Sequence, residues 1–246
     1  MESAREFAGN NDLYDLAVSG THVLLVGLYR AATSIDGVVL PTSDGMADGL
    51  VILFDGTDLT ATWARTFGAA NDDLAYACAA HPNGGFVVTG WFQGSVLFAS
   101  SGTSLTSNAG SVDAFAARYA PNGDHVWSFR YGGPGSDTGR GIDVMPSGET
   151  ILAGNFSGDI TFGTHTLTAI GSGSSDIFFT RMSAGITPVH EWAVGLGGDT
   201  YDSCEHAAID PAGNAYLVGQ FSGMTDIDGM PLTATAYDSW IGSFVR

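Results

Sequence analysis

Two series of aspartates recur along the chain and are the residues best suited to bind a cation. The first series recurs at intervals of 61, 64 and 65 residues, and its members are Asp12, Asp73, Asp137 and Asp202. The second series lies inside these intervals, at Asp48, Asp113, Asp176 and Asp238. Carboxylate oxygens are preferred ligands of Ca²⁺, so the first series is a candidate metal site. The alternative, which we favour because every copy keeps the residue, is that each aspartate accepts backbone hydrogen bonds at a turn.

A second candidate site lies at residues 202–206, where an acid, a thiol and an imidazole occur close together. Its residues are Asp202, Cys204, Glu205 and His206. If they line a narrow channel, Glu205 or His206 is expected to meet Arg140 or Tyr76 of another copy. The predicted ligand-binding residues are therefore Asp202, Glu205, His206, Arg140 and Tyr76. A metal or nucleophile interpretation is also open because cysteine and histidine are present, but an ion pair of Glu205 with Arg140 explains the acid more simply.

Composition excludes several classes of chemistry. The formal net charge is −18, from 26 acidic and 8 basic residues, and all eight basic residues are arginine. Without lysine the chain has no Walker lysine, Schiff base or lysine general base. The acidity also argues against nucleic acid and anionic membranes as partners. No nucleophile elbow or dinucleotide-binding motif occurs, and His22, His81, His125, His165 and His190 are interpreted as surface residues.

Short β-strands separated by glycine-rich turns are the elements that must position these residues. In the second copy, Asp73–Ala80 and Phe86–Phe92 are predicted strands joined by a Pro-Asn-Gly-Gly turn. Asp113–Tyr119 and His125–Tyr131 alternate apolar and polar residues and are joined by a Pro-Asn-Gly turn. Each copy therefore predicts four antiparallel strands.

Other residues recur at fixed places in the copies. A glycine ends the second strand in all four, at Gly27, Gly90, Gly154 and Gly219. A tryptophan recurs near the end of three copies, at Trp63, Trp127 and Trp192. The first strands are rich in alanine and glycine, as a crowded central axis demands, and the tryptophan strands are expected to be outermost.

The repeats predict an all-β fold, a four-bladed β-propeller with four antiparallel strands per blade. Residues 1–246 form a single domain with blades at about 12–69, 73–133, 137–198 and 202–246, the last completed by residues 2–9. Residues 4–12 are similar to residues 64–72, so the ring is expected to close by pairing of the N-terminal strand in the last blade. The structural alternative is that two chains form one eight-bladed ring, each tail completing the other's blade.

Several motifs carry a resemblance to a known family. They are Gly-Asn-x-Tyr-x-x-Gly-x-Phe-Ser-Gly at residues 213–223, Asp-x-Phe at 113–115 and 176–178, Asn-Gly-x-x-x-Trp at 122–127 and Tyr-Gly-Gly at 131–133. The chain resembles the SBBP β-propeller repeats of bacterial surface and secreted proteins over essentially its whole length. The resemblance implies a propeller fold and says little about chemistry. The sequence departs from the family at Ser3, which stands in the tryptophan position of the closing strand.

The function expected from these features is a non-enzymatic binding or scaffold module that recognises a protein or glycan. Recognition is predicted on the rim that carries the connections between the second and third strands, at residues 31–47, 93–112, 157–175 and 222–237. Segments such as Ile160–Leu167 alternate, so these connections are alternatively hairpin extensions. The functional alternative is a polysaccharide lyase or hydrolase at the channel mouth, with Asp202, Glu205 and His206 as its candidates.

The remaining expectations concern cofactors, partners and location. No cofactor is predicted, although an axial ion such as Ca²⁺ is an alternative by analogy with hemopexin-like four-bladed rings. The apolar runs are too short to span a bilayer. We expect a monomer, with a homodimer as the alternative. Acidity, the lack of lysine and Gly/Ser/Thr richness favour an extracellular or surface-exposed bacterial protein, and Met1 falls within a repeat, as in a segment of a longer protein.

Overall fold

The fold is all-β. The computed structural model describes residues 4, 6–7, 9–31, 33–43, 45–99, 104–171 and 174–244. These residues form antiparallel sheets, and their only helical element is the short 3-10 helix η1, Asn108–Gly110. No helix in the described ranges is long and apolar enough to cross a membrane.

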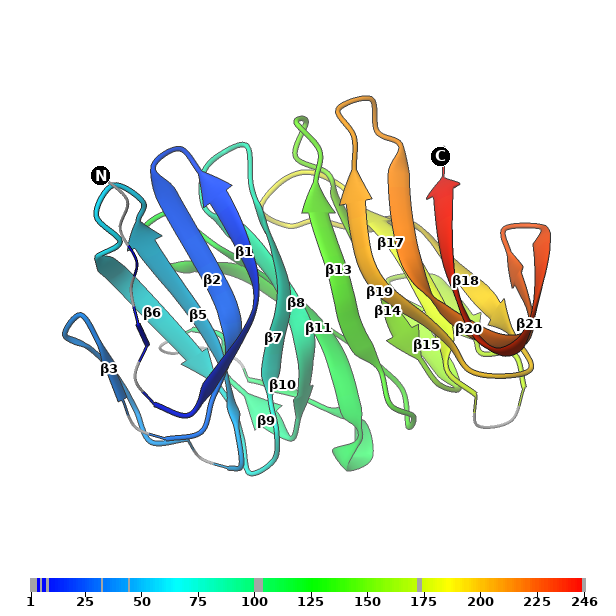
Figure 1. Ribbon diagram of the computed structural model, residues 1–246, viewed down its shortest axis with the longest axis horizontal. Coiled ribbons are helices and arrows are strands. Elements are labelled where there is room, and N and C mark those ends of the chain that lie inside the picture. The colour runs from blue at the N-terminus through cyan, green and yellow to red at the C-terminus, as the bar shows by residue number, and fades with distance from the viewer. Residues whose placement is uncertain are drawn as a thin grey trace.

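Four sheet units follow one another along the chain, numbered here as units 1 to 4 (Figure 1). Unit 1 has the order β1-β2-β5-β6, with bounds Asn11–Ser19, His22–Tyr29, Asp48–Asp55 and Ala61–Phe67. Unit 2 has the order β7-β8-β11-β12, with bounds Leu74–Ala80, Phe86–Gln93, Val112–Tyr119 and His125–Tyr131. Unit 3 has the order β13-β14-β17-β18, with bounds Thr138–Val144, Thr150–Phe156, Asp176–Met182 and His190–Gly198.

Unit 4 has three strands among the described residues. They are β19 (Asp202–Ile209), β20 (Ala215–Ile227) and β21 (Met230–Phe244), in the order β19-β20-β21. The far end of β20 also pairs with the end of β18, through Gly197 opposite Asp226 and Gly198 opposite Thr225. In units 1 to 3 a fourth strand pairs with the third. In unit 4 the third strand, β21, pairs among the described residues with β20 alone.

The predicted strands of the second copy agree with unit 2 to within one residue at each end. The tryptophan strands β6, β12 and β18 are the outer strands of their units, as predicted. The long connections form the small hairpins β3-β4 (Thr33–Ile35, Val38–Leu40), β9-β10 (Ser95–Val96, Leu105–Thr106) and β15-β16 (Asp159–Phe162, His165–Thr168). These three connections therefore contain hairpins, but each is a separate two-stranded sheet, and only the fourth connection extends its unit, as the continuation of β20 and β21.

The large hydrophobic clusters lie between consecutive units, and a smaller one lies within unit 1. One cluster joins units 1 and 2 through side chains such as Leu24, Phe67 and Phe115. Equivalent clusters join units 2 and 3 and units 3 and 4. A hydrogen bond also joins the outer strand of unit 1 to unit 2, because the Trp63 indole N–H donates to the Pro121 carbonyl at 2.9 Å. Each sheet thus buries its apolar faces against its neighbours.

The described residues do not show the predicted ring closure. The first strands lie side by side in the order β1, β7, β13 and β19, so units 1 and 4 stand at opposite ends of the row (Figure 1). Residues 2, 3, 5 and 8 of the predicted closing strand lie outside the described residues. Phe7 packs on unit 1 rather than unit 4, with its ring 5.4 Å from that of Phe54. Units 1 and 4 lie at opposite ends of the row, so among the described residues the two ends of the chain do not pair with each other.

The recurring glycine of the second strand has a steric cause. Each first strand contains a β-bulge, and the carbonyl just before the bulge lies close to that glycine. A Cβ atom added at Gly90 would stand 1.9 Å from the Leu74 oxygen, and one at Gly154 would stand 2.0 Å from the Thr138 oxygen. The position therefore excludes every side chain, because the obstacle is backbone.

We predict that Gly90→Ala lowers the free energy of unfolding by at least about 1–3 kcal/mol, the usual cost of forcing extra volume into a packed core. Urea denaturation measures the change. Gly195→Ala is the matched control, because its Cβ would meet Phe156 at an ordinary 3.6 Å. Equal losses of stability in the two variants would contradict the steric explanation.

Candidate functional site

The two aspartate series lie level with each other at one edge of the units, here called the rim. In unit 4, Phe221 pairs with Asp202 on one side and Asp238 on the other. In unit 1 the corresponding Tyr29 pairs with Asp48, and its other partner is Asn11. The structure therefore corrects the first series: Asn11, not Asp12, is the counterpart of the buried aspartates. Asp12 is exposed and pairs with Arg30 at 2.8 Å.

The buried members of the first series accept hydrogen bonds from backbone. The Asp73 carboxylate accepts from the N–H groups of Ala69 at 2.7 Å and Gln93 at 2.8 Å. Asp137 accepts from Gly133 and Ser157 in the same way. The Gly198 N–H donates to Asp202 at 2.8 Å. These contacts match the interpretation of the aspartates as turn-fixing residues.

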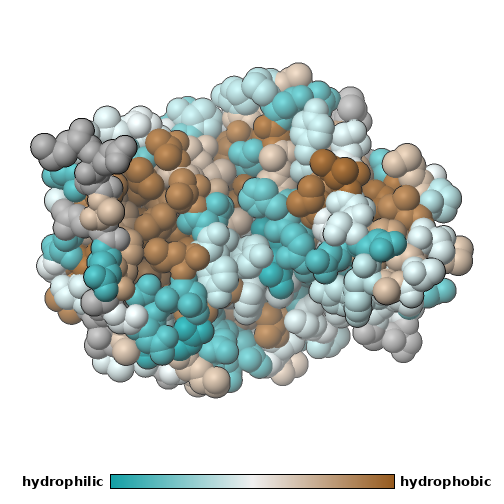
Figure 2. Space-filling view, in the orientation of Figure 1, coloured by the Kyte–Doolittle hydropathy of each residue, from teal (hydrophilic) through white to brown (hydrophobic). Residues whose placement is uncertain are grey.

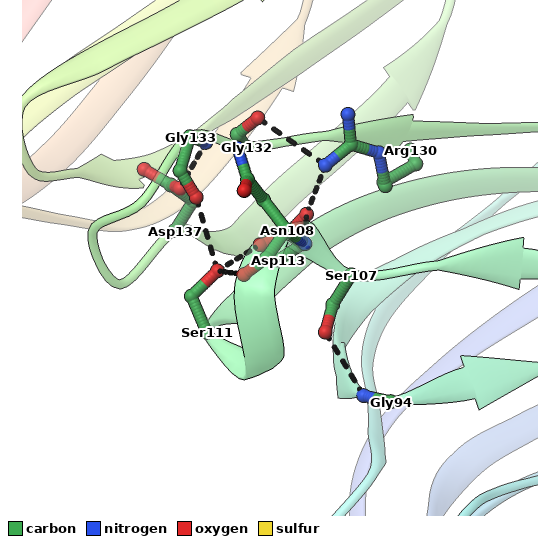
Figure 3. A network of polar contacts seen from close by, with 9 residues as sticks. All are labelled: Gly94, Ser107, Asn108, Ser111, Asp113, Arg130, Gly132, Gly133 and Asp137. Atoms are coloured by element: carbon green, nitrogen blue, oxygen red, sulfur yellow. Dashed lines mark hydrogen bonds and ion pairs between the residues drawn. The ribbon is translucent and has the colours of Figure 1, made fainter.

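The second series is connected to the first across the boundary between units. Asp113 accepts from the Asn108 N–H, the Ser111 hydroxyl and the Arg130 guanidinium (Figure 3). The Ser111 hydroxyl also contacts the Gly133 carbonyl at 3.0 Å, and the N–H of the same glycine donates to Asp137. The network therefore ties the end of unit 2 to the start of unit 3.

Burial changes the protonation of this rim. It raises the pKa of Asp73 to about 7, and those of Asp137 and Asp176 to about 6. A neighbouring carboxylate adds to each shift, for example Asp48 beside Asp73, while backbone N–H donors oppose it. The rim thus contains carboxyl groups that take up protons near neutral pH.

The predicted metal ligands Asp12, Asp73, Asp137 and Asp202 belong to four different units. Three are buried against backbone, and Asp12 is held by Arg30. Among the described residues, no group of three or more His, Cys, Asp or Glu side chains is placed to hold a metal ion.

A second set of residues lies along the first strands, at the bulges. The residue skipped by the pairing is Tyr14 in β1, Tyr76 in β7, Arg140 in β13 and Glu205 in β19. A bulge leaves its extra residue outside the regular pairing and re-aims its side chain. These four residues, here called the bulge row, thus occupy one position in four neighbouring strands.

Arg140 is the centre of the bulge row. Its guanidinium carbon is 4.7 Å from the ring centroid of Tyr76 and 5.2 Å from that of Trp91, which are cation–π distances. On its other side it lies 4.0 Å from the Glu205 carboxylate. Tyr14 stacks on Tyr76 at 5.5 Å. The row is therefore a continuous line of aromatic, cationic and anionic groups.

The structure brings together three of the five predicted ligand-binding residues, namely Tyr76, Arg140 and Glu205. Asp202 is buried at the rim, and the exposed His206 follows the bulge. Sequence reasoning missed Trp91, which reaches Arg140 from the second strand of unit 2, and Tyr14. The presence of one large residue at the same place among the small residues of each first strand would have identified the row.

An open cleft of about 560 Å³ adjoins Arg140 on the rim between units 3 and 4. Its lining includes Ser136, Thr138, Asn155, Ser157, Thr200 and Tyr201. The lining thus combines hydroxyl and amide groups with one cation, Arg140, and one carboxylate, Asp199. Such a lining can exchange several hydrogen bonds with a polar ligand.

Cys204 does not behave as a nucleophile. Its side chain is fully buried, and burial, with the nearby Glu205 carboxylate, raises its pKa to about 12. The thiol is therefore protonated at neutral pH and unsuited to attack or metal binding. Cys78 is also buried, and both cysteines are free.

The histidine interpretation needs one correction. His81 was expected at the surface, but it is buried, with burial lowering its pKa to about 4. Its Nδ1 accepts from the Asn83 N–H at 3.1 Å in the turn after β7. His190 is half-buried beside Tyr131 and Thr180, and burial lowers its pKa to about 4 as well. Both rings serve packing.

Comparison with known proteins adds no assignment to this geometry. No protein-family model matches the chain, and no curated protein matches its sequence. The resemblance to SBBP repeats therefore stays a prediction.

We predict that Asp73 makes stability depend on pH between about 4 and about 7. Its pKa is raised in the folded protein, so the folded state binds the proton more tightly, and its contribution is lost as the pH rises through about 7. The slope is at most about 1.4 kcal/mol per pH unit for one group. Asp73→Asn removes this contribution. As the pH rises from about 4 to about 7, the free energy of unfolding of the wild type is therefore expected to fall relative to that of the variant.

Urea denaturation of both proteins at several pH values measures that difference. The difference is needed because His81 and His190, whose pKa values are lowered, shift stability in the opposite direction between about 4 and 6.5. Asp124→Asn, at an exposed residue in the turn between β11 and β12, is the matched control. If the difference does not change with pH, Asp73 does not carry the raised pKa.

Proposed function

We propose that the four units are blades of a β-propeller and that this propeller is a non-enzymatic binding or scaffold module. Three observations support the propeller: the strands within each unit are antiparallel and follow one order, each first strand contains a bulge at the same place, and the first strands of the units lie side by side. A secreted or surface location in a bacterium belongs to the same proposal, and rests on the acidity and on the SBBP resemblance.

The ligand is recognised at the rim, in the cleft beside Arg140. The observation that carries this proposal is the fixed position of that guanidinium between two aromatic rings and a carboxylate. A cation held in this way loses little freedom on binding, so it can anchor a ligand at small entropic cost. The serine, threonine and asparagine side chains around it supply further donors and acceptors.

A glycan is the ligand class that this lining favours, with a protein surface as the second candidate. Sugar hydroxyls match a lining of hydroxyl and amide groups, and Tyr201 offers an aromatic surface at the same cleft. A carboxylated sugar would in addition pair with Arg140. The strong negative charge of the whole chain opposes the approach of an anionic ligand, so binding of a carboxylated sugar would depend on this local cation.

The alternative function, a polysaccharide lyase or hydrolase, finds less support. It requires two carboxylates, or a histidine and an acid, that converge on one point. Glu205 contacts Arg140 and Ser203, whereas the Asp202 carboxylate accepts the Gly198 N–H at the rim. The described part of the chain therefore offers no converging pair at this place.

We predict that Arg140→Ala weakens glycan binding by about tenfold or more, as expected for an anchoring charged group. The probe is an array of neutral and uronate-containing polysaccharides, followed by calorimetry on the best binder. Arg181→Ala is the matched control, because this arginine pairs with Glu191 in β17 and β18, away from the cleft. Unchanged binding by the Arg140 variant, or the absence of any binding on the array, would count against the proposal.

A further inference from the structure

The two ends of the row of units expose apolar side chains whose counterparts in the other units are buried or half-buried. At the unit 4 end, Tyr216 is 40 %, Val218 38 % and Ile241 73 % exposed. At the unit 1 end, Leu16 and Val18 are each 57 % exposed. Figure 2 shows the two apolar areas in a single view, one over β1 and β2 and one over the strands of unit 4.

The strand register identifies what the unit 4 surface lacks. Val218 pairs with Ile241, as Ala153 pairs with Phe179 in unit 3 and Val26 pairs with Val51 in unit 1. Those four counterparts are at most 1 % exposed, because each is covered by the next unit along the chain. The face of unit 4 is therefore one side of an inter-unit interface without its partner.

The unit 1 surface is the other side of the same interface. Leu16 stands two residues after the bulge, where unit 2 has Cys78, unit 3 has Ile142 and unit 4 has Ala207. These three counterparts are at most 7 % exposed, because each packs against the preceding unit. The exposed face of unit 1 therefore fits a preceding unit.

The N-terminal segment completes this complementarity. Phe67, at the end of the fourth strand of unit 1, packs on Phe98 and Phe115 of unit 2 at 4.7 and 4.9 Å. Phe7 stands at the corresponding place in the repeat and packs on the cluster of unit 1 that contains Leu50 and Phe54. It therefore lies where the fourth strand of a preceding unit would, and unit 4 is the unit that has no such strand among the described residues.

We infer that a second copy of this chain covers both ends, head to tail, so that two copies close one ring of eight units. Both end faces are visible from the same side, at the left and right of the first strands (Figures 1 and 2). A half-turn about the direction of those strands brings unit 4 of each copy against unit 1 of the other. The contact is heterologous at each junction, and the ring leaves neither end open.

This assembly goes beyond ligand recognition at the rim and depends only on the packing of the units. It covers the edge of β21 that has no partner strand in the described part of the chain, and an exposed edge of this kind can pair with other chains. It also places the bulge row on the inside of the ring, so that Tyr14, Tyr76, Arg140 and Glu205 of both copies face a central channel.

The test is the mass in solution of the full chain and of single-residue variants, by analytical ultracentrifugation. The wild type is expected at twice the 25.4 kDa of one chain. Leu16→Arg and Ile241→Arg, on opposite ends, are each expected to raise the dimer dissociation constant about tenfold or more. Ile186→Arg is the matched control, because Ile186 is 72 % exposed but lies in the turn between β17 and β18.

Mixing the two interface variants separates this arrangement from others. In a dimer of one Leu16→Arg chain and one Ile241→Arg chain, both substitutions lie at the same junction and the other junction is unaltered. The mixture is therefore expected to recover part of the dimer. Circular dichroism verifies that each variant is folded, and Val218→Arg replaces Ile241→Arg if that variant unfolds. A monomeric wild type, open assemblies larger than a dimer, or a dimer that survives Leu16→Arg and is lost only in Ile241→Arg would each overturn the inference.

Discussion

A sheet that is apolar on both faces must be covered on both faces, and the rest of this structure depends on that constraint. Units 1 to 3 bury much of their apolar surface in the clusters shared with the next unit. Among the described residues, unit 1 has in addition a cluster of its own around Leu50 and Phe54. Stability in such an array comes from each unit and from its contacts with its neighbours. Each unit at the end of the row has a neighbouring unit on one side only. Its other apolar face is therefore exposed.

The bulge of the first strand connects this packing to the candidate site. It brings a backbone carbonyl so close to the second strand that only glycine fits there, as at Gly90 and Gly154. The same irregularity turns one side chain of each first strand out of the regular pairing. One local feature therefore fixes the recurring glycine and aligns Tyr76, Arg140 and Glu205 across neighbouring units.

The sequence predicts local structure well here because alternation and Pro-Asn-Gly turns depend on neighbouring residues only. The strands of unit 2 and the hairpin at Ile160 follow from such patterns. The identity of Asn11 as the rim residue of unit 1 depends on register across two strands, which residue type alone does not give. The burial of His81 and the contact of Trp91 with Arg140 depend on three-dimensional packing. The arrangement of units 1 and 4 depends on the angle between units, which no local pattern encodes.

The rim aspartates and the bulge row differ in what stays the same from unit to unit. At the rim, Asp73, Asp137 and Asp202 keep the same side chain and the same backbone partners, so their chemistry is committed to the fold. In the bulge row the geometry is kept while the side chain changes, from tyrosine to arginine to glutamate. A position whose backbone is fixed and whose side chain is free can specialise without loss of stability. Recognition is therefore better placed in the bulge row, around Arg140, than at the aspartates that first suggest chemistry in the sequence.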